Sequence, residues 1–222
     1  VKAYIDAGKD KFDDNLKALV EALEVYCDSA AKYFAGETVD TITPDGDELA
    51  NYAPTKEGTL PTGVTVSGIT LTLESTTTIR LYVAGENLDG VTYTIDGTEV
   101  ALLTLADGTR YIEMANIAAK DLDRTYAFQI GGCVVNVSAL GYAHLVVNKG
   151  ASDDENLKNL LIATYNYSIA ANAYFGADTI SVSTAMGKSI VYANKSENGV
   201  QGKYVDNEKT AYTVSNDRVS LT

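Results

Sequence analysis

The stretch that decides the fold is Asn15-Leu-Lys-Ala-Leu-Val-Glu-Ala-Leu-Glu-Val-Tyr-Cys-Asp-Ser-Ala-Ala-Lys-Tyr-Phe34, which returns without a gap as Asn156-Leu-Lys-Asn-Leu-Leu-Ile-Ala-Thr-Tyr-Asn-Tyr-Ser-Ile-Ala-Ala-Asn-Ala-Tyr-Phe175. The offset between the two copies is a constant 141 residues. Chance similarity between amphipathic helices would match apolar positions only. Here Asn, Lys and the terminal Tyr-Phe pair match as well, which indicates an internal duplication.

Both copies have the period of an amphipathic helix. Apolar residues recur at spacings of three and four in the first copy at Leu16, Leu19, Val20, Leu23, Tyr26, Cys27, Ala30 and Phe34, and in the second at Leu157, Leu160, Leu161, Thr164, Tyr167, Ala171 and Phe175. Acidic residues precede each helix, and Ser152-Asp-Asp-Glu155 has the spacing of a capping box. Gly36 and Gly176 stand where a left-handed C-cap is expected.

A shorter amphipathic segment precedes each long helix, at 1–7 and at 138–147. The sequence therefore predicts two helical units, residues 1–36 and 138–176, each a short helix followed by a long one. Because the copies flank everything between them, we expect the units to pair with each other as pseudo-symmetric hairpins of one domain over residues 1–176.

The region between the helical units predicts a loop and then a sheet. Residues 37–63 contain all three prolines and read as a surface connection. From residue 64 to 137 the period changes to two, which predicts about seven short strands in an antiparallel β-sandwich. The strand residues are Ile69/Leu71/Leu73, Ile79/Leu81/Val83, Val91/Tyr93/Ile95, Val100/Leu102, Tyr111/Ile112, Tyr126/Phe128/Ile130 and Val134/Val135/Val137.

Residues 177–222 alternate weakly and show no helical period. A segment of this length is marginal as an independent domain. The predicted fold class is therefore α+β: a sandwich of about seven strands flanked by two helical hairpins, with a C-terminal strand-rich tail or the start of a second small domain.

Composition limits the classes of function. Hydrophobic residues make up 45% of the chain, and no apolar run approaches the roughly 20 residues of a membrane span. Thirty acidic residues against 17 basic ones give a net charge of −13, which disfavours binding to a phosphate backbone. The two cysteines, Cys27 and Cys133, do not make a disulfide framework, although one bond between them stays open beside the alternative of two small buried hydrophobes.

A resemblance adds to this interpretation. The helix Leu19-Val-Glu-Ala-Leu-Glu-Val-Tyr26 through Tyr33-Phe34 resembles the repeat modules of large cell-surface and secreted proteins from Gram-positive gut anaerobes. The helix ending Tyr174-Phe175 is similar to the closing helix of those modules, and Arg110-Tyr-Ile-Glu-Met-Ala-Asn-Ile to their middle. The resemblance covers about residues 1–176 and departs at Cys27, where the family tends to have Gly. It implies an extracellular setting, other modules or like subunits as partners, and no catalytic residues.

The residues themselves offer little catalytic chemistry. The single histidine, His144, lies on the apolar side of a short predicted helix without a nucleophile motif, and reads as a packed core residue. The acids Glu113, Asp121 and Asp123 have no distinguishing context for glycosidase chemistry. Asp45-Gly-Asp47-Glu48 hints weakly at calcium but lacks the ladder of ligands of a full loop. We expect no catalytic residue, no cofactor and no metal centre.

Tyrosine is the one abundant recognition residue, with 15 copies. Tyr82, Tyr93, Tyr111 and Tyr126 lie in predicted strands, and one face of a sandwich could display them as a platform for sugar rings. The alternative is that tyrosine is simply favoured in strands. The sequence thus favours a structural or adhesive surface module, with a filament subunit that lends its tail to a neighbour as a special version. A carbohydrate-binding module is the alternative, and an enzyme is disfavoured.

Overall fold

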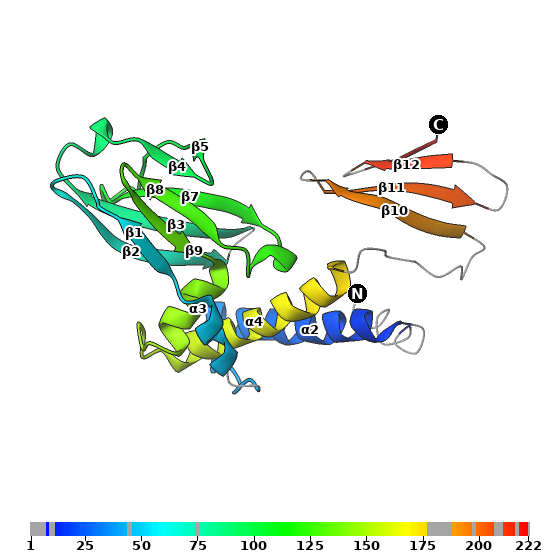
Figure 1. Ribbon diagram of the computed structural model, residues 1–222. Helices are drawn as coiled ribbons and strands as arrows, with labels where there is room; N and C mark the ends of the chain where they lie inside the picture. Colours follow the sequence, from blue (N-terminus) through cyan, green and yellow to red (C-terminus); the bar gives the residue numbers. More distant parts are fainter. Residues whose placement is uncertain are drawn as a thin grey trace. The chain divides into compact units, whose positions relative to one another are not determined.

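The computed structural model describes residues 8, 12–43, 46–73 and 76–176, together with the backbone of four strands between 188 and 221. The chain divides into two compact units, Val1–Asn172 and Ala173–Thr222. The first unit contains helices and two antiparallel sheets, which makes it α+β as predicted (Figure 1). Among the described residues, no helix is both long and apolar enough to cross a membrane.

The first copy of the duplicated stretch forms helix α2, Asp14–Ala35. The Asp13 carboxylate accepts a hydrogen bond from the backbone N–H of Leu16 at 2.8 Å and satisfies one of the free donors of the first turn. The helix ends at Gly36, whose φ of 72° is the left-handed C-cap that the sequence predicts.

The second copy forms helix α4, Glu155–Phe175. Its first turn is capped by Asp154, whose Oδ1 accepts from the N–H groups of Asn156 and Leu157 at 2.9 and 3.2 Å. The predicted capping box is therefore wrong in its first member: Ser152 accepts from the N–H of Asp154 and lies before the cap. Asp13 and Asp154 are 141 residues apart, so the duplication includes the cap.

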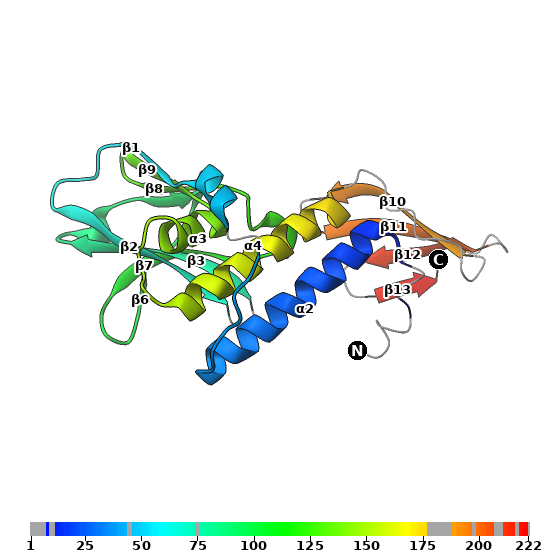
Figure 2. The same cartoon turned by 90° about the horizontal axis from the view of Figure 1, so that it is seen from below.

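The two long helices lie side by side in every view and run in opposite directions (Figure 2). The backbone N–H groups of Val39 and Ile42, which follow α2, donate to the side-chain oxygens of Asn156 and Asn159 at 2.9 and 3.3 Å. The chain leaving α2 is thus fixed to the first turns of α4. The expected pairing of the two copies is present.

A short helix, α3 (Ala139–Val147), precedes α4, and the Ser138 hydroxyl caps it by accepting from the N–H of Gly141 at 2.9 Å. This matches the short helix expected at 138–147. Its predicted counterpart at 1–7 lies outside the described residues.

The first sheet has five strands in the order β1-β9-β8-β4-β5. These strands are β1 (Thr55–Gly58), β4 (Tyr93–Ile95), β5 (Thr98–Glu99), β8 (Tyr126–Ile130) and β9 (Cys133–Val137). The second sheet has the order β2-β3-β7-β6, with β2 (Val64–Leu73), β3 (Thr77–Gly85), β6 (Leu103–Thr104) and β7 (Arg110–Ile117). Among the described residues of this unit there are also three 3-10 helices: η2 (Asp47–Tyr52), η3 (Leu88–Gly90) and η4 (Ala119–Asp121).

Two details differ from the sequence-based expectation. The interval 37–63, expected to be a surface connection, contains η2 and β1, and β1 pairs along its whole length with β9. The expected strand at Val100 and Leu102 is displaced, since residues 100–102 lie between β5 and β6 in no strand. The other six expected strands coincide with β2, β3, β4, β7, β8 and β9.

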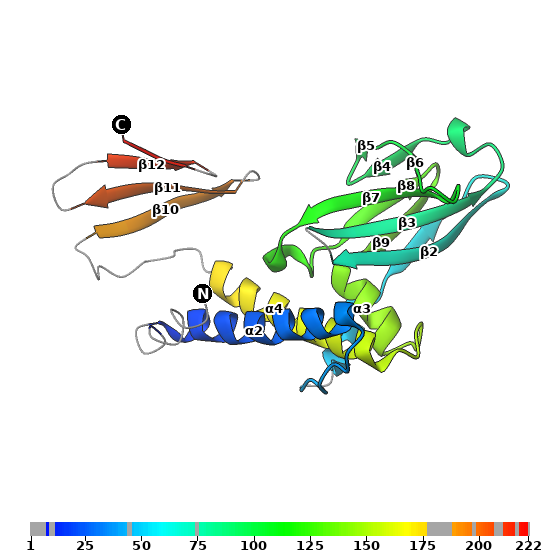
Figure 3. The same ribbon diagram turned by 180° about the vertical axis from the view of Figure 1, so that it is seen from behind.

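One hydrophobic core joins the two sheets to the helices. The apolar faces of both sheets meet in it, and α3, α4 and η2 contribute Leu140, Leu161 and Leu49. Figure 3 shows α3 and α4 at one end of the two sheets. Of the described residues, none from α2 belongs to this cluster. α2 is therefore held through α4 and the chain that follows it, and not through the sandwich-like core.

The second unit contains one antiparallel sheet in the order β10-β11-β12-β13, with strands Lys188–Ser196, Gly199–Asp206, Ala211–Ser215 and Arg218–Leu221. Its register places Ile190 opposite Tyr204, Tyr204 opposite Tyr212 and Tyr212 opposite Leu221. Directly opposite residues share a face of a sheet. The alternating positions Ile190, Tyr204, Tyr212 and Leu221 are thus paired with one another in the backbone register of the four strands.

Candidate functional site

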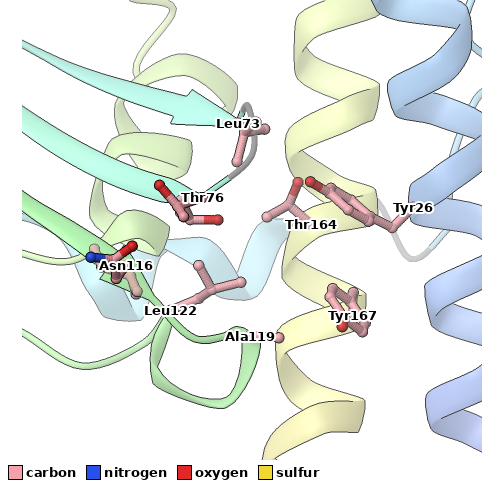
Figure 4. Close-up of a pocket in the computed structure, with 10 residues that line it drawn as sticks. Tyr26, Leu73, Thr76, Asn116, Ala119, Leu122, Thr164 and Tyr167 are labelled. Atoms are coloured by element: carbon pink, nitrogen blue, oxygen red, sulfur yellow. The ribbon is translucent and has the colours of Figure 1, made fainter. Parts of the chain in front are cut away.

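The first unit contains a cleft of about 360 Å³. It lies between the long helices and one end of the second sheet (Figure 4). Its walls come from α2, α4, β2, β3, β7 and the turn η4. The lining residues are Tyr26, Leu73, Thr76, Thr77, Asn116, Ile117, Ala119, Leu122, Thr164 and Tyr167.

A stacked pair of tyrosines forms the helical wall. The ring centroids of Tyr26 on α2 and Tyr167 on α4 are 5.3 Å apart, and the ring planes are 14° from parallel. Burial, followed by the nearby Cys27 thiol, raises the pKa of both phenols above its usual value. The two hydroxyls therefore keep their protons at neutral pH and can donate hydrogen bonds.

Threonine and asparagine supply the remaining polar groups. The Thr164 hydroxyl donates to the carbonyl of Leu160 at 2.8 Å, so its lone pairs stay available as acceptors. Figure 4 shows the Tyr26 hydroxyl directed toward Thr164, with Thr76 and Asn116 on the opposite wall. Asn116 has a φ of 60°, a left-handed conformation that asparagine tolerates better than most residues.

The cleft is electrically neutral. Apart from the two phenols, none of its lining residues is ionisable. Hydroxyl, amide and aromatic groups around a partly open cavity suit an uncharged ligand with hydroxyl groups, which can stack on a ring and exchange hydrogen bonds.

The four tyrosines expected as a platform are separated by the fold. Tyr93 and Tyr126 point into the core and are 4% and 2% exposed. Tyr82 and Tyr111 lie side by side on the face of the second sheet that is turned away from the core, with their ring centroids 5.9 Å apart. The Arg80 guanidinium lies 5.0 Å from the centre of the Tyr111 ring, and Tyr111 is buried. An exposed platform of these four rings is therefore not formed, because the strand register places two of them inward.

The disulfide that the sequence leaves open is not formed. Both cysteines are free: Cys27 is exposed on α2, and Cys133 is buried at the start of β9. The sole histidine, His144, is buried in α3 with Nδ1 3.1 Å from the side-chain oxygen of Asn148.

The acids considered for glycosidase chemistry are each paired elsewhere. Glu113 accepts from Arg80 at 2.9 Å, Asp121 from Lys120 at 2.7 Å, and Asp123 from the Asn172 amide at 2.9 Å. Asp45 lies outside the described residues, and Asp47 begins η2. Within the described part of the chain, no group of three or more His, Cys, Asp or Glu side chains could hold a metal ion.

No pattern in the sequence pointed directly to the cleft. Tyr26 and Tyr167 were identifiable as equivalent residues of the duplication, which is the one clue that they could meet. Thr76 and Asn116 come from strand ends far apart in the chain, and only the tertiary structure brings them together. No family model, no curated protein and no solved structure matches this chain.

Proposed function

We propose that this chain is a non-catalytic structural or adhesive module of a cell-surface or secreted protein. The observation that carries the proposal is the repetition of helix contacts. Each copy has an aspartate N-cap, an ion pair three residues apart (Lys17 with Asp14, Lys158 with Glu155) and an edge-to-face Tyr-Phe pair at its end. None of these residues lines the cleft, and their repetition supports a scaffolding role for the helices.

The arrangement in series supports the same proposal. The boundary between the two compact units falls in the last turn of α4, so one duplicated helix links the units covalently. A chain of linked modules needs connections of this kind, and other modules of the same protein or like subunits are the proposed partners. We further propose that the sandwich is flanked by two pseudo-symmetric helical hairpins and followed by a strand-rich tail. Backbone chemical shifts of residues 1–7 test the first hairpin, which requires helical values there.

Adhesion is tested with purified chain coupled to beads and applied to epithelial cells and to surfaces coated with mucin or matrix proteins. The proposal expects retention of the coated beads above that of beads carrying an unrelated acidic protein of matched charge. Antibody labelling of intact cells that express the protein, with and without protease shaving, tests the surface location. Turnover of any substrate in a broad glycan and peptide hydrolysis panel contradicts the non-catalytic proposal.

The filament version of the proposal rests on the second unit. The single four-stranded sheet of this unit has two outer strands, β10 and β13, and each of them pairs with only one strand of the sheet. Strand addition at these edges would join one subunit to the next. Electron microscopy of the full chain should then show filaments, and truncation after Gly176 should abolish them. A truncated protein that still assembles contradicts this version.

A second candidate function is carbohydrate binding, which the neutral cleft beside Tyr26 and Tyr167 favours. We propose Asn116 as a hydrogen-bonding residue of that site. Asn116→Gly removes the amide without backbone strain, because glycine accepts a positive φ. Asn87→Gly is the matched control, since Asn87 also has a positive φ (55°) and does not line the cleft.

Affinity electrophoresis against plant and host polysaccharides should retard the parent chain and the Asn87→Gly variant equally. The Asn116→Gly variant should bind about tenfold more weakly, as expected for loss of one to two hydrogen bonds. Absence of retardation of the parent on a broad panel, or equal retardation of both variants, contradicts this site.

A further inference from the structure

Gly68 lies in the interior of β2, and the backbone gives no reason for a glycine at this position. Glycine weakens a strand, because it has no side chain to pack and loses the most freedom on folding. The φ of Gly68 lies outside the left-handed region, and a Cβ there would meet nothing within 4 Å. The bulge between Val66 and Gly68 requires glycine only where φ is positive. A remaining use of such a glycine is to let a ligand approach the backbone closely.

The open space over Gly68 lies on the face of the second sheet that is turned away from the core. Gly68 pairs with Tyr82 of β3, and Tyr82 pairs with Tyr111 of β7, so the three residues share one face. The neighbouring β3 residue Leu81 points the other way and is buried in the core. Figure 3 shows this sheet in front of the first one, with α2, α3 and α4 below it and none of these helices across its outer face.

The Tyr82 ring leaves the space over Gly68 uncovered. Its hydroxyl oxygen lies 3.1 Å from that of Thr70, the next residue after Gly68 on the same face, and its centroid lies 5.9 Å from that of Tyr111. A ring that covered the glycine would lie within 4 Å of a Cβ at Gly68, and no atom does. A ligand could therefore rest on the backbone at Gly68 with the half-buried Tyr82 beside it.

An ion pair on the same face supplies hydrogen-bonding groups. Arg80 lies opposite Thr70 in the register, and its Nε donates to Glu113 Oε2 at 2.9 Å. A cation–π contact, with the guanidinium carbon 5.0 Å from the centre of the Tyr111 ring, also holds Arg80 in place. The Arg80 and Glu113 side chains are 28% and 26% exposed. A guanidinium has several donors and a carboxylate several acceptor positions, so the pair retains both kinds of group for a ligand.

We propose that these residues form a second ligand site, which binds an uncharged glycan. The site, called the Gly68 patch below, consists of Gly68, Thr70, Arg80, Tyr82 and Glu113. A sugar ring that rests on Gly68 presents its C–H groups to the Tyr82 ring. Its hydroxyl groups each donate and accept, so neighbouring hydroxyls can accept from Arg80 and donate to Glu113.

Charge selects the class of glycan. Glu113 neutralises Arg80, and the chain has a net charge of −13, so an acidic sugar is disfavoured at the Gly68 patch. No residue of the patch lines the cleft beside Tyr26 and Tyr167. The inference rests on the candidate function of carbohydrate binding, but it does not require the cleft to be the binding site.

Gly68→Val tests the inference, because a valine side chain fills the open space and is favoured in strands. Affinity electrophoresis of the full chain in gels containing xyloglucan, galactomannan or mixed-linkage β-glucan measures binding to neutral polysaccharides. For those that retard the parent, Gly68→Val should bind at least about tenfold more weakly. It should also raise the midpoint of thermal unfolding by about 1–3 °C, since it removes a glycine from a strand. A glycine with a purely structural role would not combine a gain in stability with a loss of binding.

Arg80→Lys keeps the charge of the patch but loses the forked donor, so it should also bind about tenfold more weakly. Gly90→Val is the matched control, because Gly90 has no left-handed φ, a Cβ there meets nothing within 4 Å, and it lies outside the patch. It should bind as the parent does. Circular dichroism confirms that each variant is folded.

Asn116→Gly separates this site from the cleft. Gly68→Val should weaken binding whether or not Asn116→Gly does. Weaker binding of Asn116→Gly together with unchanged binding of Gly68→Val leaves carbohydrate binding at the cleft and overturns the Gly68 patch. Unchanged binding of Arg80→Lys, or an equal loss in Gly90→Val, overturns it as well. A parent chain that none of the three polysaccharides retards overturns the patch and contradicts carbohydrate binding by the chain.

Discussion

Tyr26 and Tyr167 stack with their ring centroids 5.3 Å apart, and the two residues occupy equivalent positions in the two copies of the duplicated helix. Two copies of one helix that pack antiparallel are related by a local twofold axis, and a residue near that axis meets its own counterpart. The duplication in the sequence therefore corresponds to the packing of α2 against α4 in the structure. It also explains why α2, which contributes nothing to the main core among the described residues, is held in place.

The stacked pair should stabilise the helix packing beyond its buried area. Tyr26→Ala and Tyr167→Ala should each destabilise the first unit, and a double-mutant cycle should give a coupling of about 0.5–1.5 kcal/mol. Urea denaturation of the variants measures it. Tyr26→Phe, which keeps the ring, should keep the coupling. A coupling indistinguishable from zero would show that the rings are merely adjacent.

The aspartate caps should contribute equally in the two copies. Asp13→Ala and Asp154→Ala should each lower the free energy of unfolding by about 1 kcal/mol, while Asp13→Asn and Asp154→Asn should change it little, since asparagine caps as well as aspartate. Ser152→Ala is the control, because Ser152 lies outside the first turn of α4. Thermal unfolding followed by circular dichroism distinguishes these variants, and a loss for Ser152→Ala equal to that for Asp154→Ala refutes the assignment of the cap.

Buried tyrosines should make the protein sensitive to alkali. Burial, together with the hydrogen bond from its hydroxyl to Glu48 at 2.6 Å, raises the pKa of Tyr165, and burial raises the pKa of Tyr126 and Tyr142. Because the pKa of these phenols is higher in the folded state, the folded protein keeps protons that the unfolded chain loses when the pH rises past the ordinary tyrosine pKa of about 10. Stability should thus be unaffected by these groups below pH about 9 and should fall as the pH rises past about 10.

Denaturant midpoints between neutral and alkaline pH, read beside tyrosinate absorbance, check this dependence. Tyr165→Phe should flatten the alkaline decline and lower stability at neutral pH by about 1 kcal/mol through the lost hydrogen bond. An alkaline decline of the same slope in this variant would show that Tyr165 does not contribute to it.

Two glycines with the same backbone conformation should respond differently to alanine. Gly36 and Gly58 have φ of 72° and 76°, so each alanine incurs the strain of a left-handed residue, about 1–2 kcal/mol. A Cβ at Gly36 meets nothing within 4 Å, whereas one at Gly58 would lie 2.2 Å from the carbonyl oxygen of Gly132. Gly58→Ala should therefore destabilise the chain clearly more than Gly36→Ala in the same denaturation assay. Equal losses would mean that β1 moves away from β9 without cost.

Local patterns predicted the helices well. The apolar period of three and four, the acids before each helix and Gly36 after the first are properties of neighbouring residues, so they could be read without the fold. The sequence did not predict that Asp154, and not Ser152, caps α4. Both residues are suitable N-caps, and which of them caps the helix depends on which residue is the first in the helix.

Strands were predictable where burial makes them alternate. β3, with Ile79, Leu81 and Val83 facing the core, was evident from its period. β1 was missed because its residues Thr55–Gly58 are all exposed and it is defined only by hydrogen bonds to β9, about 80 positions further along the chain. Tyr93 and Tyr126 were assigned to strands but not to a face, which the register alone decides.

The sequence by itself determined that one helix is used twice, that a sheet region lies between the copies, and that the surface is acidic, since each follows from composition or from residues within a few turns of one another. Only the tertiary structure decided that Tyr26 meets Tyr167, that Thr76 and Asn116 face them across a neutral cleft, and that β2 stands at an edge. Those outcomes depend on strand register and on helix packing between segments that are far apart in the chain. The contacts that favour one register or packing over another are long-range, so no local sequence pattern predicts them.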